Sequence, residues 1–543
     1  MSDKGRSKSL QELCAAVRHG DNKAGDLGAL GVVLIERGEY RRGAVCFRAA
    51  VAICPNDQRL LHHVARALLG SGGAEEAAAH LQRALEIEPS WLESWELLGT
   101  VYLDHLNRSA EAFPIFRQAI QLAPSKLENY QSAARCRLCG STPREVIDYL
   151  RESLPDDADR LNQRRGVGLA LAQTGRYEEA IAVFQEIVCR HPDDPVSLHG
   201  LAKMYTGLHD LAAAGRCFER VIATAENDPD LNLGYVLHLW RLGDFEGARH
   251  FYRSHMRDLP IHFSLTRLPS IWEGQDVRAK TVRLIAGDIY FGDAIQFVRF
   301  ARIAKQAGAT VIVEGPKRIR SLLRTVPGVD LALAFHDRIP PFDYAASAFS
   351  LLFLLQSPVE EMLDGPPYIQ ADTGLREKWR IRLRATPGIN IGIVWRGSPY
   401  NYGNRYACRS MSLEELRPLT RIPGVNVYSL QRGPGHEELS EAIPPFPAID
   451  LAPDFQNAAA VISEVDLVVT IDTSIAHLAG ALGKLTYVML PYDACFRWMM
   501  DRADTPWYPT MRLFRQTEPG EWSDVVRAVV DAVSGFSHKK AAP

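Results

Sequence analysis

The sequence predicts an α-solenoid followed by an α/β region of two lobes, and three observations lead to this prediction. A pattern of small and aromatic residues recurs about every 34 residues through the first half of the 543-residue chain. After about residue 260, apolar runs alternate with helical patterns, as in parallel sheets covered by helices. A bridge rich in proline, glycine and charge divides these runs into two sets. We therefore expect an N-terminal segment 1–24, a helical array 25–258, a first lobe 259–365, a linker 366–388, a second lobe 389–535 and a tail 536–543.

Composition and charge exclude several classes of protein. The chain is 46% hydrophobic and 23% charged, with a net charge of −3, which argues against a basic nucleic-acid-binding surface. No apolar run reaches the roughly 20 residues that span a bilayer, and the N-terminus lacks the apolar core of a secretory signal. Nine scattered cysteines without a CxxC pair suggest neither a zinc site nor a disulfide framework. We therefore expect a cytoplasmic protein.

The repeat of the first half is clearest between Trp95 and Tyr102, which fit the pattern W-x2-L-G-x2-Y. The same frame recurs at other positions, among them Gly31, Tyr40, Phe47, Pro55, Ala77, Leu81, Pro89, Phe116, Pro124, Tyr177, Phe184, Phe218, Phe245 and Tyr252. This half resembles the tetratricopeptide family over roughly residues 25–256. The resemblance implies six or seven helical hairpins stacked into a superhelix, whose groove holds a protein. The named aromatic side chains are expected mainly in the core.

The second half alternates strands and helices. Expected helices cover Ala294 to Gln306 and Lys317 to Arg324. The expected strands are the apolar runs 281–286, 310–313, 330–333, 390–395, 426–430, 466–471 and 485–490. These runs predict two doubly wound lobes that face each other across a cleft. We expect the lobes and the helical array to have separate cores, with few contacts between them.

One buried strand ends abruptly at Asp472, Thr473 and Ser474, which also begin the next helix. Ligands of open parallel sheets lie beyond the carboxyl ends of the strands. The first turn of a helix adds free N–H groups and a positive dipole end, which favour an anion. The strand end therefore predicts a phosphate or diphosphate site. Asp472 would accept hydrogen bonds from sugar hydroxyls or orient the loop, and His477 lies one turn into the helix.

The stretch from Asp472 to Gly483 resembles the motif D-T-[SG]-x-x-H-L-A-x-A-L-G of the heptosyltransferase-like glycosyltransferases, which have the two-lobed GT-B fold. The stretch from Gly292 to Phe297 is similar to the first-lobe motif G-D-x-[IVL] of that family. Further second-lobe landmarks agree in order, namely Trp395, Arg396, Gly397, Arg409, Ser410, Ser429, Leu430, Gln431, Arg497, Trp498 and residues 507–514. Over nearly its whole length the chain resembles bacterial proteins that fuse tetratricopeptide repeats to this transferase, including those that modify flagellin.

The resemblance implies a metal-independent transfer of a sugar from a nucleotide-sugar to a protein acceptor. Asp293 would be the catalytic base. The donor-binding residues would be Gly292, Arg396, Arg409, Gln431, Asp472, Thr473, Ser474, His477 and Arg497. No cofactor is implied beyond the donor, for which a CMP-linked sugar is one candidate, and flagellin is one candidate acceptor in the groove. The chain departs from the family pattern in the loop 287–291 and at residues 494–496.

Each candidate residue also has a purely structural interpretation. Asp293 is in place to cap the helix that follows it, and Thr473 or Ser474 to cap theirs. Arg396, Arg409 or Arg497 can instead form an ordinary surface salt bridge. His477 can instead be a hydrogen-bonded residue in the wall of the site. Two other functions stay open: a scaffold whose transferase lobes are degenerate, and a transferase that acts on lipopolysaccharide or another glycan.

Overall fold

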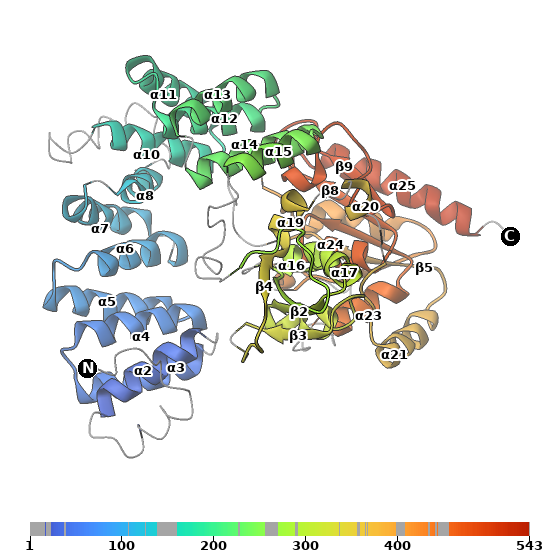
Figure 1. Cartoon of the computed structure of the whole chain (residues 1–543), viewed down its shortest axis with the longest axis horizontal. Coiled ribbons are helices and arrows are strands. Elements are labelled where there is room, and N and C mark those ends of the chain that lie inside the picture. The colour runs from blue at the N-terminus through green and yellow to red at the C-terminus, as the bar shows by residue number, and fades with distance from the viewer. Residues whose placement is uncertain are drawn as a thin grey trace. The chain divides into compact units, whose positions relative to one another are not determined.

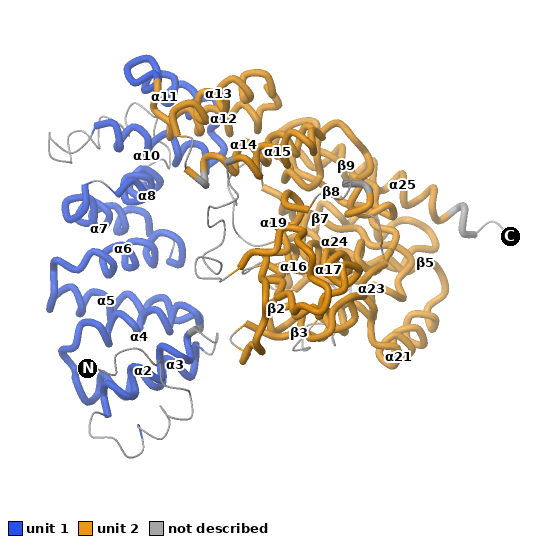
Figure 2. Tube along the Cα trace, viewed as in Figure 1, with its two compact units in different colours: residues 1–192 blue, residues 193–543 orange. Residues whose placement is uncertain are grey.

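The computed structural model (Figure 1) forms two compact units, residues 1–192 and 193–543 (Figure 2). The structure describes residues 17, 23–36, 40–106, 108–124, 126–137, 160–225, 228–255, 270–287, 291–335, 337–355, 359–363, 365, 367–397, 408–432, 435–439, 443 and 455–541. The expected N-terminal segment 1–24 therefore lies almost wholly outside the described residues. None of the helices in the described part of the chain has both the length and the apolar composition that a bilayer crossing requires.

The first unit consists of helical hairpins. Its described helices are α2 (Lys23–Glu36), α3 (Tyr40–Ile53), α4 (Gln58–Ser71), α5 (Ala74–Ile87), α6 (Leu92–Thr100) with its continuation η1 (Val101–His105), α7 (Ser109–Leu122), α8 (Leu127–Arg137), α10 (Arg160–Gln173) and α11 (Tyr177–Arg190). Two further hairpins, α12 (Pro195–Gly207) with α13 (Leu211–Thr224) and α14 (Pro229–Leu242) with α15 (Phe245–His255), begin the second unit. The predicted solenoid of helical hairpins is confirmed.

Small residues allow the two helices of a hairpin to cross closely. A methyl group on Gly31 would come within 2.7 Å of the Phe47 ring, and one on Gly99 within 2.7 Å of the Phe116 ring. Phe47 and Phe116 are almost completely buried. The repeating glycine and phenylalanine are therefore one packing unit, in which the aromatic ring fills the space that the missing side chain leaves.

The rest of the second unit holds two parallel sheets. The first has the order β3-β2-β1-β4 and the second β6-β5-β7-β8-β9, with all pairs parallel. The strands are β1 (Thr281–Ile285), β2 (Thr310–Gly315), β3 (Leu331–Ala334), β4 (Tyr344–Ser347), β5 (Ile389–Val394), β6 (Val425–Ser429), β7 (Leu467–Ile471), β8 (Thr486–Leu490) and β9 (Met511–Arg515). All seven predicted strands are present, and parallel α/β sheets are confirmed.

Helices and short turns connect these strands. They are α16 (Phe291–Phe297), η2 (Val298–Phe300), α17 (Ala301–Gln306), η3 (Lys317–Ile319), α18 (Arg320–Leu323), α19 (Ala348–Leu354), α20 (Val359–Leu363), α21 (Thr373–Arg384), η4 (Leu413–Arg421), η5 (His436–Glu438), α23 (Gln456–Glu464), α24 (Ser474–Ala481), η6 (Phe496–Trp498) and α25 (Ser523–Ala541). Three expectations differ from this arrangement. The helix expected from Ala294 begins at Phe291 and is broken into three pieces, the linker 366–388 contains α21, and the tail 536–543 continues α25 as far as Ala541.

The two lobes meet through helices that each follow a strand. Helix α16 of the first lobe packs against α24 of the second, and Figure 1 shows the two labels side by side. The guanidinium of Arg299, only 1% exposed, donates to the Trp507 carbonyl oxygen at 3.1 Å and to the Tyr368 hydroxyl at 3.1 Å. One apolar core therefore runs through both lobes, which brings the carboxyl ends of β1 and β7 close to each other.

The last repeat hairpin shares that core. Trp240 of α14 contacts the rings of Phe353 (centroids 5.7 Å apart) and Trp507 (6.0 Å). Tyr252 of α15 stacks on Phe353 at 4.7 Å, and its hydroxyl donates to Ser350 Oγ at 3.1 Å. The expectation of separate cores is wrong here, because α14 and α15 carry large aromatic side chains that pack against the lobe. The end of the repeat pattern near residue 258 is thus not the start of a compact unit.

Candidate functional site

The predicted phosphate site lies where β7 ends and α24 begins. Thr473 occupies the N-cap position with extended backbone (φ −143°, ψ 173°), but its side chain makes no capping hydrogen bond. The hydroxyl instead lies 3.3 Å from the Thr470 hydroxyl. The expected capping by Thr473 is therefore absent, and its side chain does not occupy the N–H groups in the first turn of α24. Such a helix start is suited to an anion.

Asp472 lies between two basic side chains beside this helix start. Its Oδ2 is 3.9 Å from Arg409 Nη1, and its Oδ1 is 3.8 Å from His477 Nε2. Both distances exceed hydrogen-bonding range, so neither neighbour forms a direct hydrogen bond with the carboxylate, which lies in the field of the Arg409 charge. Arg409 in turn lies against the backbone of Gly397, where an added methyl group would meet its Nε at 2.8 Å. The predicted residues Arg409, Asp472 and His477 are thus brought together.

His477 is a buried, neutral member of the site. Its ring stacks on Trp498 with centroids 5.5 Å apart and planes at 19°, and Nδ1 lies 3.1 Å from the Tyr508 hydroxyl. Burial lowers the pKa of His477 to about 3, so the contact with Asp472 is not an ion pair at neutral pH. With 4% of its surface exposed, His477 forms a wall of the site. Gly292 lies against that wall, since a methyl group there would be 2.9 Å from His477 Cδ2.

Asp293 enters the site from the first lobe. The chain leaves β1 through Gly287, which has the left-handed conformation that glycine tolerates (φ 87°). Helix α16 is the next element. Because α16 begins at Phe291, Asp293 lies in its first turn and not at a cap position. Its Oδ1 pairs with Arg497 Nη2. The side chain is 31% exposed, and within the described residues its Oδ2 has no partner.

Arg497 connects the two lobes at this point. Its Nε donates to Gln296 Oε1 at 2.8 Å and its Nη1 to Cys495 Sγ at 2.8 Å. Burial opposes the charge of Arg497, but Cys495, Asp293 and Asp472 outweigh burial and raise its pKa above the usual value. The guanidinium is therefore a permanent positive charge that fixes Asp293 in one orientation.

Gln431 and Arg396 form a neighbouring group at the ends of β5 and β6. Gln431 Oε1 accepts from the backbone N–H groups of Trp395 (3.1 Å) and Arg396 (3.0 Å), and its Nε2 donates to the Arg396 carbonyl at 2.8 Å. The amide of Gln431 thus holds the turn after β5. Arg396 Nε lies 2.6 Å from Glu438 Oε1, as an ion pair. Both residues adjoin the site through Gly397 and Arg409.

Gln296 and Tyr508 contribute to the site but were not among the residues predicted from the sequence. The amide of Gln296 is completely buried. Its Oε1 accepts from Arg497, and its Nε2 has no hydrogen-bond partner among the described residues. Tyr508 orients His477 and packs on Gly480, where a methyl group would be 2.4 Å from its ring. Gln296 follows Asp293 by three residues, and this helical spacing places both on one face of α16. The spacing could therefore have identified Gln296 as a residue of the site. Tyr508 lies in the landmark stretch 507–514, but nothing in that stretch indicated its contact with His477.

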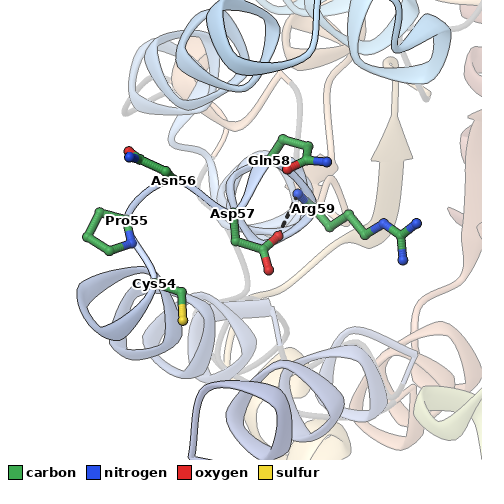
Figure 3. Close-up of a pocket in the computed structure, with 6 residues that line it drawn as sticks. All are labelled: Cys54, Pro55, Asn56, Asp57, Gln58 and Arg59. Atoms are coloured by element: carbon green, nitrogen blue, oxygen red, sulfur yellow. Dashed lines mark hydrogen bonds between the residues drawn. The ribbon is translucent and has the colours of Figure 1, made fainter.

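Two surface hollows of the described structure lie away from this site. One, of about 590 Å³, is lined by six consecutive residues, Cys54 to Arg59, which form the turn after α3 and the start of α4 (Figure 3). Asp57 Oδ1 accepts there from the backbone N–H groups of Arg59 (2.9 Å) and Leu60 (3.1 Å), which is ordinary N-capping of α4. A second, of about 320 Å³, includes Asn390 and Asp466 at the amino ends of β5 and β7. It is at the opposite end of the sheet from the candidate site.

Because burial lowers the pKa values of three histidines in the second unit, we expect acid to destabilise that unit. Burial lowers the pKa of His199 to about 3, of His238 to about 4 and of His477 to about 3. Between about pH 6.5 and these values the unfolded chain binds more protons than the folded chain, so stability falls as pH falls. Each histidine contributes at most about 1.4 kcal/mol per pH unit. Thermal melting from pH 7 to 5 should show a smaller pH dependence in His199→Gln. The exposed His191→Gln is the control, and equal slopes for His199→Gln and wild type would contradict the prediction.

The first part of the chain contains tetratricopeptide repeats. Residues 65–126 and 161–204 each match a family described as tetratricopeptide repeat. It is similar to Protein FlbA of Caulobacter vibrioides, with 24% identity over 429 residues, which are 72% of this chain and 70% of FlbA. Because the array ends before the midpoint of the chain, this match includes part of the α/β region.

Other likenesses concern the repeats. The cytochrome c-type biogenesis protein CycH of Rhizobium meliloti is 27% identical over 119 residues, which are 21% of this chain and 31% of CycH. The crystal structure of YrrB, described as a TPR protein with an unusual peptide-binding site, is 16% identical, with 35% of this chain and 98% of YrrB covered and a TM-score of 0.26.

Proposed function

We propose that this protein is a metal-independent glycosyltransferase of the GT-B type that moves a sugar from a nucleotide-sugar to a protein acceptor. The observation that carries the proposal is the meeting of Asp293, from the end of β1, with the start of α24, from the end of β7, across Gly292, His477 and Arg497. Carboxyl ends of parallel strands are where such sheets bind ligands. The resemblance of both segments to transferase motifs supports the same function.

The chemistry divides between the two lobes. Asp293 takes the proton from the acceptor hydroxyl as that oxygen attacks the anomeric carbon, a contribution typically worth about 10²–10⁴-fold. The bond to the donor phosphate breaks at the same centre, and the first turn of α24 stabilises the leaving phosphate with N–H groups and its dipole. Arg409 supplies a positive charge beside Asp472. Arg497 holds Asp293 in place.

The repeats provide the binding surface for the acceptor. Tetratricopeptide arrays bind proteins in their grooves, and resemblance to repeat-fused transferases makes flagellin the first acceptor to test and a CMP-sugar the first donor. We propose that the reaction takes place in the cytoplasm. The direct test is intact-mass analysis of candidate acceptors from cells with and without the gene. A mass increase of one sugar that depends on the gene supports the proposal. No mass difference in any acceptor, together with no nucleotide binding, favours a scaffold.

The donor site yields a separate prediction. Asp472→Ala removes the carboxylate that orients Arg409, and Thr473→Ala removes a hydroxyl at the helix start. Each substitution should raise the Kd for nucleotide by up to about tenfold. The loss of one hydrogen bond costs about 1 kcal/mol of binding free energy, and a tenfold change in Kd corresponds to about 1.4 kcal/mol. Calorimetric titration with CMP, UDP and GDP measures this, with the exposed Asp531→Ala of α25 as the control. Wild-type affinity in both variants would remove the helix start from the donor site.

A further inference from the structure

A short segment, residues 492–498, connects the last repeat hairpins to the candidate site. Its last three residues form η6, which includes Arg497. At its beginning, Arg241 of α14 pairs with Asp493 Oδ1 at 2.8 Å and also donates to the carbonyl of Ala494. The Arg241 and Asp493 side chains are only 10% and 18% exposed. A pair so shielded from water, with two acceptors on one guanidinium, holds its geometry better than an exposed pair.

A second repeat residue holds the same segment. The ring of His209, in the turn between α12 and α13, stacks on Tyr492 with centroids 4.3 Å apart and planes at 8°. Its Nε2 lies 3.1 Å from the Tyr492 carbonyl oxygen. His209 adopts a left-handed conformation with φ 64°, which is unusual for a residue other than glycine. Gly175 and Gly243 adopt the same left-handed conformation at the corresponding turns of other hairpins, so the turn is common to the repeats. At this turn the position carries the imidazole of His209, which reaches the segment.

The far end of the segment enters the site. Ala494 is only three residues from Arg497, whose guanidinium contacts Asp293, Gln296 and Cys495. Trp498 stacks on His477. Two hydrogen bonds hold η6 itself, from Trp498 N to the Cys495 carbonyl at 3.0 Å and from Met499 N to the Phe496 carbonyl at 3.1 Å. Because Ala494 lies three residues before Arg497, we expect a shift of Ala494 to move Arg497 or to weaken these bonds.

We propose that Arg241 is a positioning residue for the reaction: the last repeat hairpin holds segment 492–498 so that Arg497 meets Asp293. The repeats then do more than bind the acceptor, because the geometry of the catalytic carboxylate depends on a repeat helix. The consequence for transfer rests on the proposed function. The consequence for the order of η6 does not.

The experiment uses the full-length chain with Arg241→Gln and Arg241→Lys. Hydrogen exchange by mass spectrometry reports on the amides of Trp498 and Met499. We expect exchange there to rise at least tenfold in Arg241→Gln, and less in Arg241→Lys, because lysine keeps the charge but not the planar fork that reaches Asp493 and Ala494 together. Exchange at Leu513, whose amide donates to the Ala503 carbonyl, should stay as in wild type. Arg216→Gln, exposed on neighbouring α13, is the matched control.

Transfer is measured on the same proteins. Arg241→Gln should lower kcat about tenfold or more with little change in the KM for donor, and Arg241→Lys should recover part of the loss. If Arg241 acts through Arg497, the losses from Arg241→Gln and Arg497→Lys should be less than additive when combined. Unchanged exchange at Trp498 and Met499 in Arg241→Gln would overturn the proposal, as would strictly additive losses. If wild type transfers no sugar, the proposed function fails, and the exchange result still decides whether Arg241 positions η6. If Arg241→Gln does not fold, the same exchange and transfer measurements are made on Arg241→Lys and Asp493→Asn and compared with wild type.

Discussion

Asp293→Asn should slow sugar transfer by on the order of 10²-fold or more, because an amide has nearly the shape of the carboxylate but cannot take a proton from the acceptor. Nucleotide affinity should stay close to wild type, since the donor phosphate is assigned to the start of α24. The rate is measured as acceptor mass shift over time at saturating donor. Asp276→Asn, an exposed aspartate of the same lobe, should transfer at the wild-type rate.

Stability must be measured beside that rate, because Asp293 is also the partner of Arg497. Asparagine removes the negative charge from a guanidinium that is only 15% exposed, and a negative charge from the first turn of α16. We expect a loss of about 1–3 kcal/mol of unfolding free energy, less than the cost of breaking a fully buried pair. Rates compared well below the melting temperature separate the two effects. A folded Asn variant with the wild-type rate would reduce Asp293 to a structural partner of Arg497. A wild type that transfers nothing, with every donor and acceptor tried, would favour the scaffold.

A fragment that begins at residue 262 should fail to fold stably, whereas residues 193–543 should fold. The shorter fragment lacks Trp240, Phe251 and Tyr252, which share the core of the lobes. Burial of a large apolar side chain contributes about 1.5–3 kcal/mol, so loss of three such contacts approaches the whole net stability of about 5–15 kcal/mol. The cut also exposes Trp507 and Phe353. Cooperative melting and nucleotide titration of the two fragments are the measurements.

The longer fragment is the matched control, since it keeps α12 to α15 with both sheets in one compact unit. Cooperative unfolding of 262–543 at the temperature of 193–543 would contradict the shared core. Failure of both fragments would show instead that residues 1–192 are needed for stability.

Local patterns determined the secondary structure because each depends on residues close in the chain. A glycine that faces an aromatic ring, as with Gly31 and Phe47, recurs with each hairpin and marks the repeats. Apolar runs of a few residues mark parallel strands that are buried on both faces. The end of β7 at Asp472 and the start of α24 were therefore predictable, as was the entry of Asp293 after β1. The division of the helix after Asp293 into α16, η2 and α17 was not predicted, since the apolar pattern continues through it.

Tertiary structure alone decided which side chains meet. Asp293 and Arg497 are 204 residues apart, and their pairing depends on how α16 packs against α24 and on where η6 lies. Gln431 was expected from the sequence to bind the donor, and the tertiary structure shows that its amide also holds the backbone turn after β5. The repeat pattern likewise ends after Tyr252, yet α14 and α15 complete the core of the lobes. The physical reason is that periodicity is a property of one segment, whereas an ion pair or a shared core requires two distant surfaces to be complementary in three dimensions.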